Sequence, residues 1–243
     1  MSADPGIVFG RIPVLECLRA RRRPPRRLYI LASAARGLDE IVSAAAGVPV
    51  EETDRAGLDR LAAGGNHQGV VLRAAPPEVF DLETWLERHP EPDAFAVLLD
   101  CVEDPQNFGA VIRSAAAFGA AGVLFGKDRA APLSPAAVKA AAGGVEHVDL
   151  VQVTNLARAV EGMQKAGFWA AALDAGGQKT LWDADLTGRS LVVVGNEGDG
   201  IRRLVRDRCD FIVSIPMAGA ISSLNASVSA AIALAECRRR RPA

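Results

Sequence analysis

Residues 95–126 read "FAVLLDCVEDPQNFGAVIRSAAAFGAAGVLFG" and decide the fold of the longer part of this chain. They hold an apolar strand, a polar turn, a helical stretch rich in alanine and a second apolar strand. The two strand segments, 95–100 and 121–126, are apolar at consecutive positions instead of alternate ones. Such strands are buried on both faces, as in a parallel sheet with helices on each side. The stretch therefore predicts a strand–helix–strand unit of an α/β domain.

The same two patterns alternate along the rest of the chain. Further apolar segments predict strands at 148–153, 168–174, 190–195 and 210–216. Helical segments fall between them, and the segment 222–241 predicts a long final helix. This order indicates an α/β domain of about six strands with helical connections.

A shorter α/β pattern occupies residues 7–75. Its expected helices include "IPVLECLRA" and "GLDEIVSAAAG", and its expected strands are "RLYIL", "VPVEE" and "GVVLRAA". Residues 76–93 then bring four prolines and mixed charge, which is typical of a linker that carries a short helix. We therefore expect a small α/β domain at 1–75, a linker at 76–93 and a large α/β domain at 94–243.

Composition restricts the class of protein. Of the 243 residues, 49% are apolar, which indicates a globular chain. There is no apolar run of ~18 residues and no signal-peptide layout at the start, so we expect a cytoplasmic protein without a membrane span. Four cysteines, Cys17, Cys101, Cys209 and Cys237, are scattered without a C-x-x-C pair. Neither a metal site nor a disulfide framework is therefore expected, and buried free thiols are favoured.

Two runs of arginine stand out against a net charge of −1. The run "RARRRPPRR" at 19–27 holds six arginines in nine residues, and "RRRR" occupies 238–241. Such clusters either neutralise the phosphates of a nucleic acid or lie in solvent as a charged loop and a frayed tail.

Three polar loops follow apolar strands of the large domain, at the sheet edge where α/β folds bind ligands. The first loop, 100–109, contains Asn107, which we expect to cap the helix that carries Arg113. Arg113 interrupts an otherwise packing helix and must find acceptors, with Glu197 as a candidate partner.

The second and third loops are 195–201 and 215–225. "GNEGDGI" is rich in glycine, which lets backbone N–H groups approach a phosphate or a nucleoside, but it lacks the dinucleotide fingerprint G-x-G-x-x-G. In "IPMAGAISSLN", Ser222 or Ser223 is expected to cap the final helix, and Asn225 falls in its first turn, where an asparagine needs polar partners. The histidines are isolated, so a hydrolase triad is not expected.

Together, "DPQNFGAVIRSAAAFG", "VVGNEGDGI" and "IPMAGAISSLNASVSAA" resemble the three sequence motifs of the SpoU (TrmH-type) RNA ribose 2′-O-methyltransferases. The resemblance keeps the family's order and approximate spacing and covers about residues 95–237. The leader "FGRIPVLECLRA" and the segment "NHQGVVLRA" resemble, more loosely, the small RNA-binding domain of the RlmB subgroup, which methylates an rRNA guanosine. This chain departs from that subgroup at "RIP", where a histidine is usual, and at "KAAAGGVEH", where a serine is usual.

The resemblance implies a SPOUT-type α/β fold, a parallel sheet with a C-terminal trefoil knot, which is a rare exception to unknotted chains. It also implies a homodimer. S-adenosylmethionine would be bound at Gly195, Asn196, Gly198, Ile215, Met217 and Leu224. The family's catalytic positions correspond to Arg113, Asn107, Glu197, Ser223 and Asn225. In the small domain, RNA would be contacted by Arg19, Arg22, Arg23, Arg26 and Arg27.

The implied reaction is methyl transfer from S-adenosylmethionine to a ribose 2′-hydroxyl of RNA, with a guanosine of large-subunit (23S-type) rRNA as the expected substrate. This hydroxyl is a poor nucleophile, so the site must orient it in line and help its proton leave. An arginine guanidinium keeps its own proton at neutral pH. We therefore expect Arg113, held by Glu197, to favour loss of the hydroxyl proton and to anchor a phosphate.

Other interpretations remain open at this point. A tRNA ribose and an rRNA adenosine, methylated for antibiotic resistance, are alternative substrates of the same chemistry. A Rossmann-type nucleotide enzyme would rest on "VVVGNEGDG" alone and would leave Asn107 and the third loop unexplained. A non-catalytic RNA-binding protein would use the small domain alone.

Overall fold

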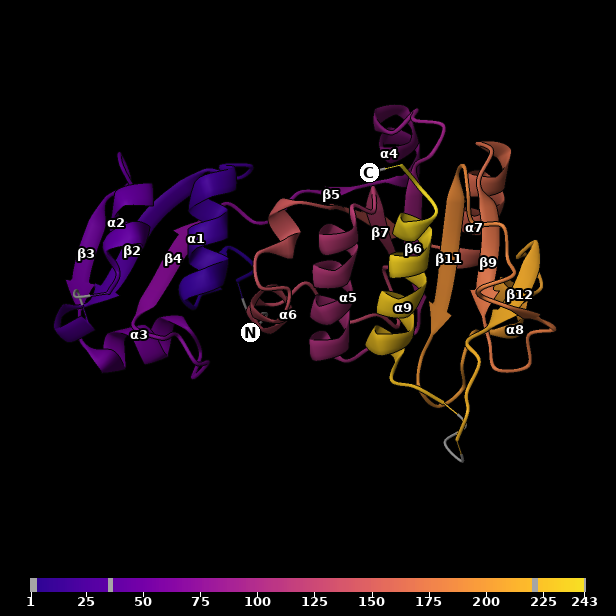
Figure 1. Cartoon of the computed structure of the whole chain (residues 1–243). Coiled ribbons are helices and arrows are strands. Elements are labelled where there is room, and N and C mark those ends of the chain that lie inside the picture. Colours follow the sequence, from indigo (N-terminus) through magenta and orange to yellow (C-terminus); the bar gives the residue numbers. More distant parts are fainter. Residues whose placement is uncertain (1–3, 35–36, 220–222, 243) are drawn as a thin grey trace.

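The structure is a computed structural model that describes residues 4–34, 37–219 and 223–242. Two sheets lie one after the other along the molecule, the smaller built from the first part of the chain and the larger from the rest (Figure 1). Within the described ranges, no helix has the length and apolar character that crossing a membrane requires.

The small sheet has the strand order β1-β4-β2-β3, in which β2 and β3 are parallel and the other pairs antiparallel. Its elements are β1 (Ile7–Phe9), α1 (Arg11–Ala20), β2 (Pro25–Leu31), the 3-10 turn Ala32–Ala34, α2 (Asp39–Ala44), β3 (Val50–Thr53), α3 (Arg55–Leu61) and β4 (Val70–Ala74). Side chains alternate along β2, so that Leu28 and Ile30 pack with α1 and α2, while Tyr29 and Leu31 pack on the side of α3. Every strand and helix expected here is present, and β1 and the 3-10 turn Ala32–Ala34 are the additional elements.

The large sheet has eight strands in the order β10-β12-β9-β11-β6-β7-β8-β5, and all its pairs are parallel. Its strands are β5 (Val79–Phe80), β6 (Phe95–Asp100), β7 (Gly122–Gly126), β8 (Asp149–Val153), β9 (Trp169–Leu173), β10 (Lys179–Thr180), β11 (Ser190–Gly195) and β12 (Phe211–Ser214). The six expected strands are confirmed, and the two additional ones are two-residue segments at the edges.

Helices cover both faces of this sheet, as the continuous apolar strands predict. The helical elements are α4 (Leu82–Arg88), α5 (Pro105–Phe118), α6 (Pro135–Ala140), the 3-10 turn Gly144–Glu146, α7 (Leu156–Lys165), α8 (Arg203–Arg206) and α9 (Ala226–Arg239). Along β6, Val97 and Leu99 pack with α5 and α9, whereas Ala96 and Leu98 pack with α4 and α7. In Figure 1, α5 and α9 lie side by side in front of the sheet. The expected α/β class is confirmed, and the trefoil knot stays a prediction.

The segment 76–93, expected as a linker, is packed into the large sheet. Its β5 pairs with β8, and its helix α4 begins at the N-cap Asp81. Trp85 on α4 is fully buried, and a Cβ at Gly122 would lie only 2.8 Å from the Trp85 ring. The indole therefore occupies a space that only glycine leaves open, and the tryptophan fixes this segment to the large sheet.

Ion pairs join the small domain to the large sheet. Arg23 is buried and lies 2.7 Å from the Glu146 carboxylate, and Arg22 pairs with Asp149. These two arginines were predicted to bind RNA. That prediction is wrong for Arg23, because its guanidinium is enclosed by the domain interface and bonded to protein acceptors. Arg22 is committed to the same interface.

Asp149 makes this interface sensitive to acid. Burial alone would raise its pKa, but hydrogen bonds from His89 and Arg22 hold the pKa below the usual value. A depressed carboxyl pKa stabilises the fold above the unfolded-state value of about 3.9 and loses that contribution as pH falls through the lower, folded value. We therefore expect the melting temperature to drop as pH falls below about 4, and to drop less in Asp149→Asn. An equally steep loss in Asp149→Asn, measured by circular dichroism, would assign the acid sensitivity to other groups.

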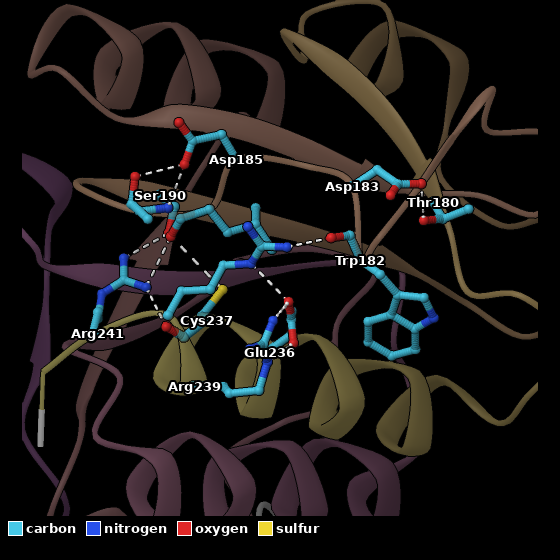
Figure 2. A network of polar contacts seen from close by, with 12 residues as sticks. Thr180, Trp182, Asp183, Asp185, Ser190, Glu236, Cys237, Arg239 and Arg241 are labelled. Atoms are coloured by element: carbon cyan, nitrogen blue, oxygen red, sulfur yellow. Dashed lines mark hydrogen bonds and ion pairs between the residues drawn. The ribbon is translucent and has the colours of Figure 1, made fainter.

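The C-terminal arginines are ordered, which corrects the expectation of a frayed or phosphate-binding tail. Arg241 is buried, and its guanidinium donates to the carbonyls of Asp93, Leu186 and Gly188 and to the Ser190 hydroxyl. Figure 2 shows Arg241 with Ser190 and Cys237, and Arg239 with Glu236. Glu236 also accepts from Arg240. A planar guanidinium carries enough donors for several carbonyls at once, so the run fastens the end of α9 to the amino edge of the sheet.

Candidate functional site

Three loops meet at the carboxyl edge of the large sheet. Asp100, the last residue of β6, pairs with Gly195, the last residue of β11, so the loops after these strands leave the sheet as neighbours. The loop after β12 leaves from a strand further along, beyond β9. It returns because α9 packs beside α5, which brings Asn225 next to Asn107.

The first loop places Asn107 in the opening turn of α5. Asp104, not Asn107, is the N-cap, since its carboxylate accepts the backbone N–H groups of Gln106 and Asn107 at 3.2 Å. Pro105 follows as the first helical residue, where its missing N–H costs nothing. The sequence prediction misplaced the cap because it did not use Asp104. The correction leaves the Asn107 side chain available for the site.

The second loop is held by the side chain of Asn196. Its Oδ1 accepts from the backbone N–H of Gly198 at 2.9 Å and of Asp199 at 2.7 Å, which closes a tight turn. A Cβ at Gly195 would lie 2.1 Å from the carbonyl carbon of Gly200, so the crossing of the two backbones requires glycine at 195. This turn presents the carboxylate of Glu197.

The third loop ends at Asn225, which is itself the N-cap of α9. Its Oδ1 accepts from the backbone N–H of Ser227 at 2.9 Å and of Val228 at 3.3 Å. The expectation that a serine caps this helix is therefore wrong for Ser223; Ser222 lies outside the described residues. Because the cap uses Oδ1, the Asn225 amide group is oriented away from the helix and is free to donate.

The three loops close into one hydrogen-bonded cluster of Asn107, Glu197 and Asn225. Glu197 Oε1 accepts from Asn107 Nδ2 at 2.8 Å and from Asn225 Nδ2 at 2.5 Å. Asn225 Nδ2 also donates to Asn107 Oδ1 at 2.9 Å. The cluster lines a cavity of about 640 Å³. One carboxylate thus fixes the orientation of both amides, which is the arrangement that a polar binding site needs.

Arg113 lies apart from this cluster. It is exposed, and it makes no hydrogen bond or ion pair with any residue in the described ranges. The expected Arg113–Glu197 ion pair is therefore not formed, because Glu197 is bound by the two asparagines. Arg113 follows Asn107 by six residues on α5, which places it about 9 Å further along the helix and roughly 240° around it. The two side chains therefore leave different faces of the helix.

A second, smaller cavity of about 110 Å³ lies beside the third loop. Its lining includes Ile215, Met217, Ser223 and Leu224 from that loop, and Leu173 and Asp174 from the end of β9. The backbone N–H groups of Ile215 and Leu224 have no acceptor in the part of the chain that the structure describes. Apolar walls, unpaired backbone donors and one carboxylate suit an adenosine with a cationic sulfonium, so the residues fit S-adenosylmethionine.

The expected cofactor residues divide between the two cavities. Ile215, Met217 and Leu224 line the smaller one, whereas Asn196 lines the larger one with Glu197. Gly195 and Gly198 line neither and serve the turn instead. Asp174 was missed by the sequence analysis, although it ends the apolar run "FWAAALD" in the way that Asp100 ends "FAVLLD". An acidic residue at the end of a buried parallel strand is the signal that would have identified both Asp100 and Asp174.

The remaining arginines of the 19–27 run are exposed. Arg19 pairs with Glu40 on α2, and Arg27 lies 2.6 Å from Glu51 on β3. The Arg26 side chain makes neither a hydrogen bond nor an ion pair with the residues that the structure describes, so its guanidinium is the freest of the run. No cluster of three or more potential metal ligands occurs among the described residues.

Comparison with known proteins identifies the family. Residues 94–235 match the SpoU rRNA Methylase family, and residues 7–80 match the RNA 2′-O ribose methyltransferase substrate binding domain. A protein of Mycolicibacterium vanbaalenii named as an uncharacterized tRNA/rRNA methyltransferase is 44% identical over 247 residues, which cover 98% of this chain and 77% of that protein.

Solved structures agree. The SpoU methyltransferase AviRb from Streptomyces viridochromogenes, in complex with AdoMet, superposes with a TM-score of 0.79 at 28% identity, over 96% of this chain and 89% of that one. The TrmH/SpoU tRNA modifying enzyme of A. aeolicus gives a TM-score of 0.55 at 25% identity, over 66% of this chain and 84% of that one. The sequence matches, the parallel sheet and the meeting of the three motif loops all lead to one assignment: this chain belongs to the SpoU family of RNA methyltransferases.

Proposed function

We propose that this protein transfers a methyl group from S-adenosylmethionine to the 2′-hydroxyl of a guanosine ribose in large-subunit rRNA. The observation that carries the proposal is the Asn107–Glu197–Asn225 cluster, in which all three motif loops are joined by hydrogen bonds. Residues 94–243 would form the catalytic domain, and residues 1–75 would bind RNA. The segment 76–93 would join these two parts.

The two cavities suit the two reactants. The smaller cavity, with Ile215, Met217 and Leu224, would hold the adenosine end of the cofactor. When bound, S-adenosylmethionine supplies a methyl group activated by its positive sulfur. The larger cavity, with Asn107 and Glu197, would hold the target ribose. Its amides are already oriented, so they can position the hydroxyl without reorganisation.

Arg113 would stabilise the oxygen anion that develops as the ribose hydroxyl loses its proton. Arg113 points away from the Asn107 cluster of its own chain. The proposal therefore requires a homodimer, in which the second subunit or the bound RNA completes the site next to Arg113. Arginine suits this role, since its fork of donors binds an oxygen anion and a neighbouring phosphate together.

The part of this chain that the tRNA enzyme leaves unmatched favours rRNA over tRNA as the substrate. The tRNA modifying enzyme of A. aeolicus matches 66% of this chain, whereas the family model that matches residues 94–235 is named for rRNA. The substrate-binding domain at 7–80 is thus a feature that a compact tRNA enzyme need not share. The RlmB-like leader supports a guanosine. A tRNA ribose is the second candidate, because relatives carry the name tRNA/rRNA methyltransferase.

The test is methyl transfer from tritium-labelled S-adenosylmethionine to protein-free rRNA and tRNA, followed by digestion to nucleosides. We expect label in 2′-O-methylguanosine from large-subunit rRNA. Label in tRNA alone would keep the chemistry and move the substrate to the second candidate. Failure to bind the cofactor, measured by calorimetry, would remove the enzymatic assignment of this site.

A further inference from the structure

A third cavity, of about 410 Å³, lies at the same carboxyl edge of the large sheet, on the side of β7 and β8. Its walls come from the loop after β7, the start of α7 and the start of α8. Neither the proposed cofactor pocket nor the Asn107 cluster includes these residues. The cavity therefore needs its own explanation.

Its lining is rich in positive charge. Three arginines, Arg129, Arg202 and Arg203, line it together with a single carboxylate, Asp128. Arg203 is 85% exposed and has only a long contact with Asp207, at 3.3 Å. Arg129 has no hydrogen-bond partner in the described part of the chain. The guanidinium groups of Arg129 and Arg203 are therefore available to an anion from solution.

The start of α7 adds backbone donors to the same cavity. Asn155 caps this ten-residue helix and accepts from the N–H of Arg158 at 3.1 Å. The N–H groups of the first two helical residues, Leu156 and Ala157, find no acceptor within residues 4–34, 37–219 and 223–242, and both residues line the cavity. Unpaired N–H groups at a helix start attract anions, and phosphates above all.

The backbone of the β7 loop is held in an uncommon conformation at this point. Arg129 has φ = 54°, in the left-handed region, which is strained for a residue other than glycine. The loop folds back so closely that a Cβ at Gly126 would lie 2.8 Å from the Asp128 carbonyl oxygen. Strain of this kind is concentrated at binding sites, and here it sets an arginine into the cavity wall.

One ion pair, Arg202–Asp100, lies between this cavity and the proposed site. Asp100, which is fully buried, accepts from both the backbone N–H and the Nε of Arg202 at 2.7 Å. Cys101, the next residue, lines the cavity of the Asn107 cluster. Burial and Asp100 raise the pKa of the Cys101 thiol, and Arg202 and Arg129 oppose this, so both cations lie near it. The two cavities therefore lie on either side of this ion pair, at the same edge of the sheet.

We propose that this cavity binds a backbone phosphate of the RNA strand next to the methylated nucleotide. The inference rests on the proposed function, since it places the strand relative to the target ribose. Leu204, which is 76% exposed at the cavity rim, offers an apolar surface to the base of that flanking nucleotide. The cofactor does not suit this cavity, because arginines repel a sulfonium.

The test compares the double variant Arg129→Ala/Arg203→Ala with Arg208→Ala. Arg208 is an exposed arginine just beyond α8 that pairs with Glu161 at 2.9 Å and does not line the cavity. Arg202 is left in place, because its loss would leave the buried Asp100 carboxylate without a counter-charge. The measurements are the Kd values of the cofactor and of inorganic phosphate by calorimetry, and kcat and KM for protein-free large-subunit rRNA at several salt concentrations.

We expect the double variant to raise KM for rRNA by about 10- to 100-fold per lost charged contact, with kcat and the cofactor Kd within about twofold. The slope of the logarithm of rRNA affinity against the logarithm of salt concentration should also become less steep, by about 0.7–0.9 for each lost phosphate contact. Arg208→Ala should match the wild type in every measurement.

Two outcomes would overturn the inference while leaving the proposed function intact. One is a double variant whose KM and salt slope match those of Arg208→Ala. The other is an unchanged KM together with lost binding of inorganic phosphate, which would assign the cavity to a free anion. A wild-type protein that neither binds the cofactor nor methylates RNA would instead reject the proposed function itself.

Discussion

Arg113→Ala is expected to lower kcat for methyl transfer to rRNA by about 100- to 1,000-fold, with the cofactor Kd unchanged. The reason is that the ribose hydroxyl must lose its proton while the methyl group moves, and the guanidinium is the free cation on the motif helix α5. Arg113→Lys should recover only a small part of the rate, since an ammonium group cannot hold an oxygen anion and a phosphate in one plane. The measurement is single-turnover transfer of labelled methyl at saturating rRNA.

The structure offers a clean control for this experiment. Arg113 is exposed and its side chain makes no described hydrogen bond or ion pair, so its loss should change the free energy of unfolding by about 0.5 kcal/mol or less. Lys165→Ala, an exposed cation at the far end of α7, should keep wild-type kcat. A near-wild-type kcat with a raised KM in Arg113→Ala would reduce Arg113 to a phosphate anchor. Full activity in Arg113→Lys would exclude any role for the guanidinium fork.

Glu146→Ala is expected to reduce the free energy of unfolding by about 3–5 kcal/mol, the largest stability effect we predict. Glu146 accepts from Arg23 at the interface between the small domain and the large sheet, where both side chains are at most 5% exposed. Removing the carboxylate leaves the Arg23 guanidinium buried without its counter-charge, and the cost of that desolvation far exceeds the energy of the lost hydrogen bond. Urea denaturation monitored by circular dichroism measures the change.

Two variants separate this effect from the loss of any ion pair. Glu51→Ala removes the partner of Arg27 in an exposed pair and should leave the urea midpoint nearly unchanged, since water screens such pairs. Arg23→Met/Glu146→Leu replaces the buried pair with apolar side chains and should restore most of the stability. If the double variant were as unstable as Glu146→Ala, the stability of the interface would come from the ion pair itself. The unpaired charge on Arg23 would then not explain the instability of Glu146→Ala.

Local sequence predicted the elements of this fold well where one physical signal dominated. The continuous apolar runs of β6 and β11 predicted a parallel sheet, because only strands covered on both faces tolerate apolar side chains at every position. The segment 76–93 was harder, since prolines and charges mask a single tryptophan, Trp85, that anchors it. Its burial depends on the absence of a side chain at Gly122, which lies on another strand.

The two arginine runs show the same limit of prediction from local sequence, this time for charged residues. Arg23 and Arg241 read as surface cations, yet both are buried against acceptors supplied by distant parts of the chain. A guanidinium is buried only when such acceptors converge on it, and that convergence is a property of packing, which composition does not encode.

The sequence by itself determined the α/β class, the strand order along the chain and the three polar loops, because these follow from short-range patterns of apolar and turn-forming residues. Only the tertiary structure decided that Asn107, Glu197 and Asn225 form one hydrogen-bonded cluster and that Arg113 stands outside it. The physical reason is that α9 returns from β12 to pack on α5, which joins residues 118 positions apart, while the turn of α5 directs Asn107 and Arg113 to different faces.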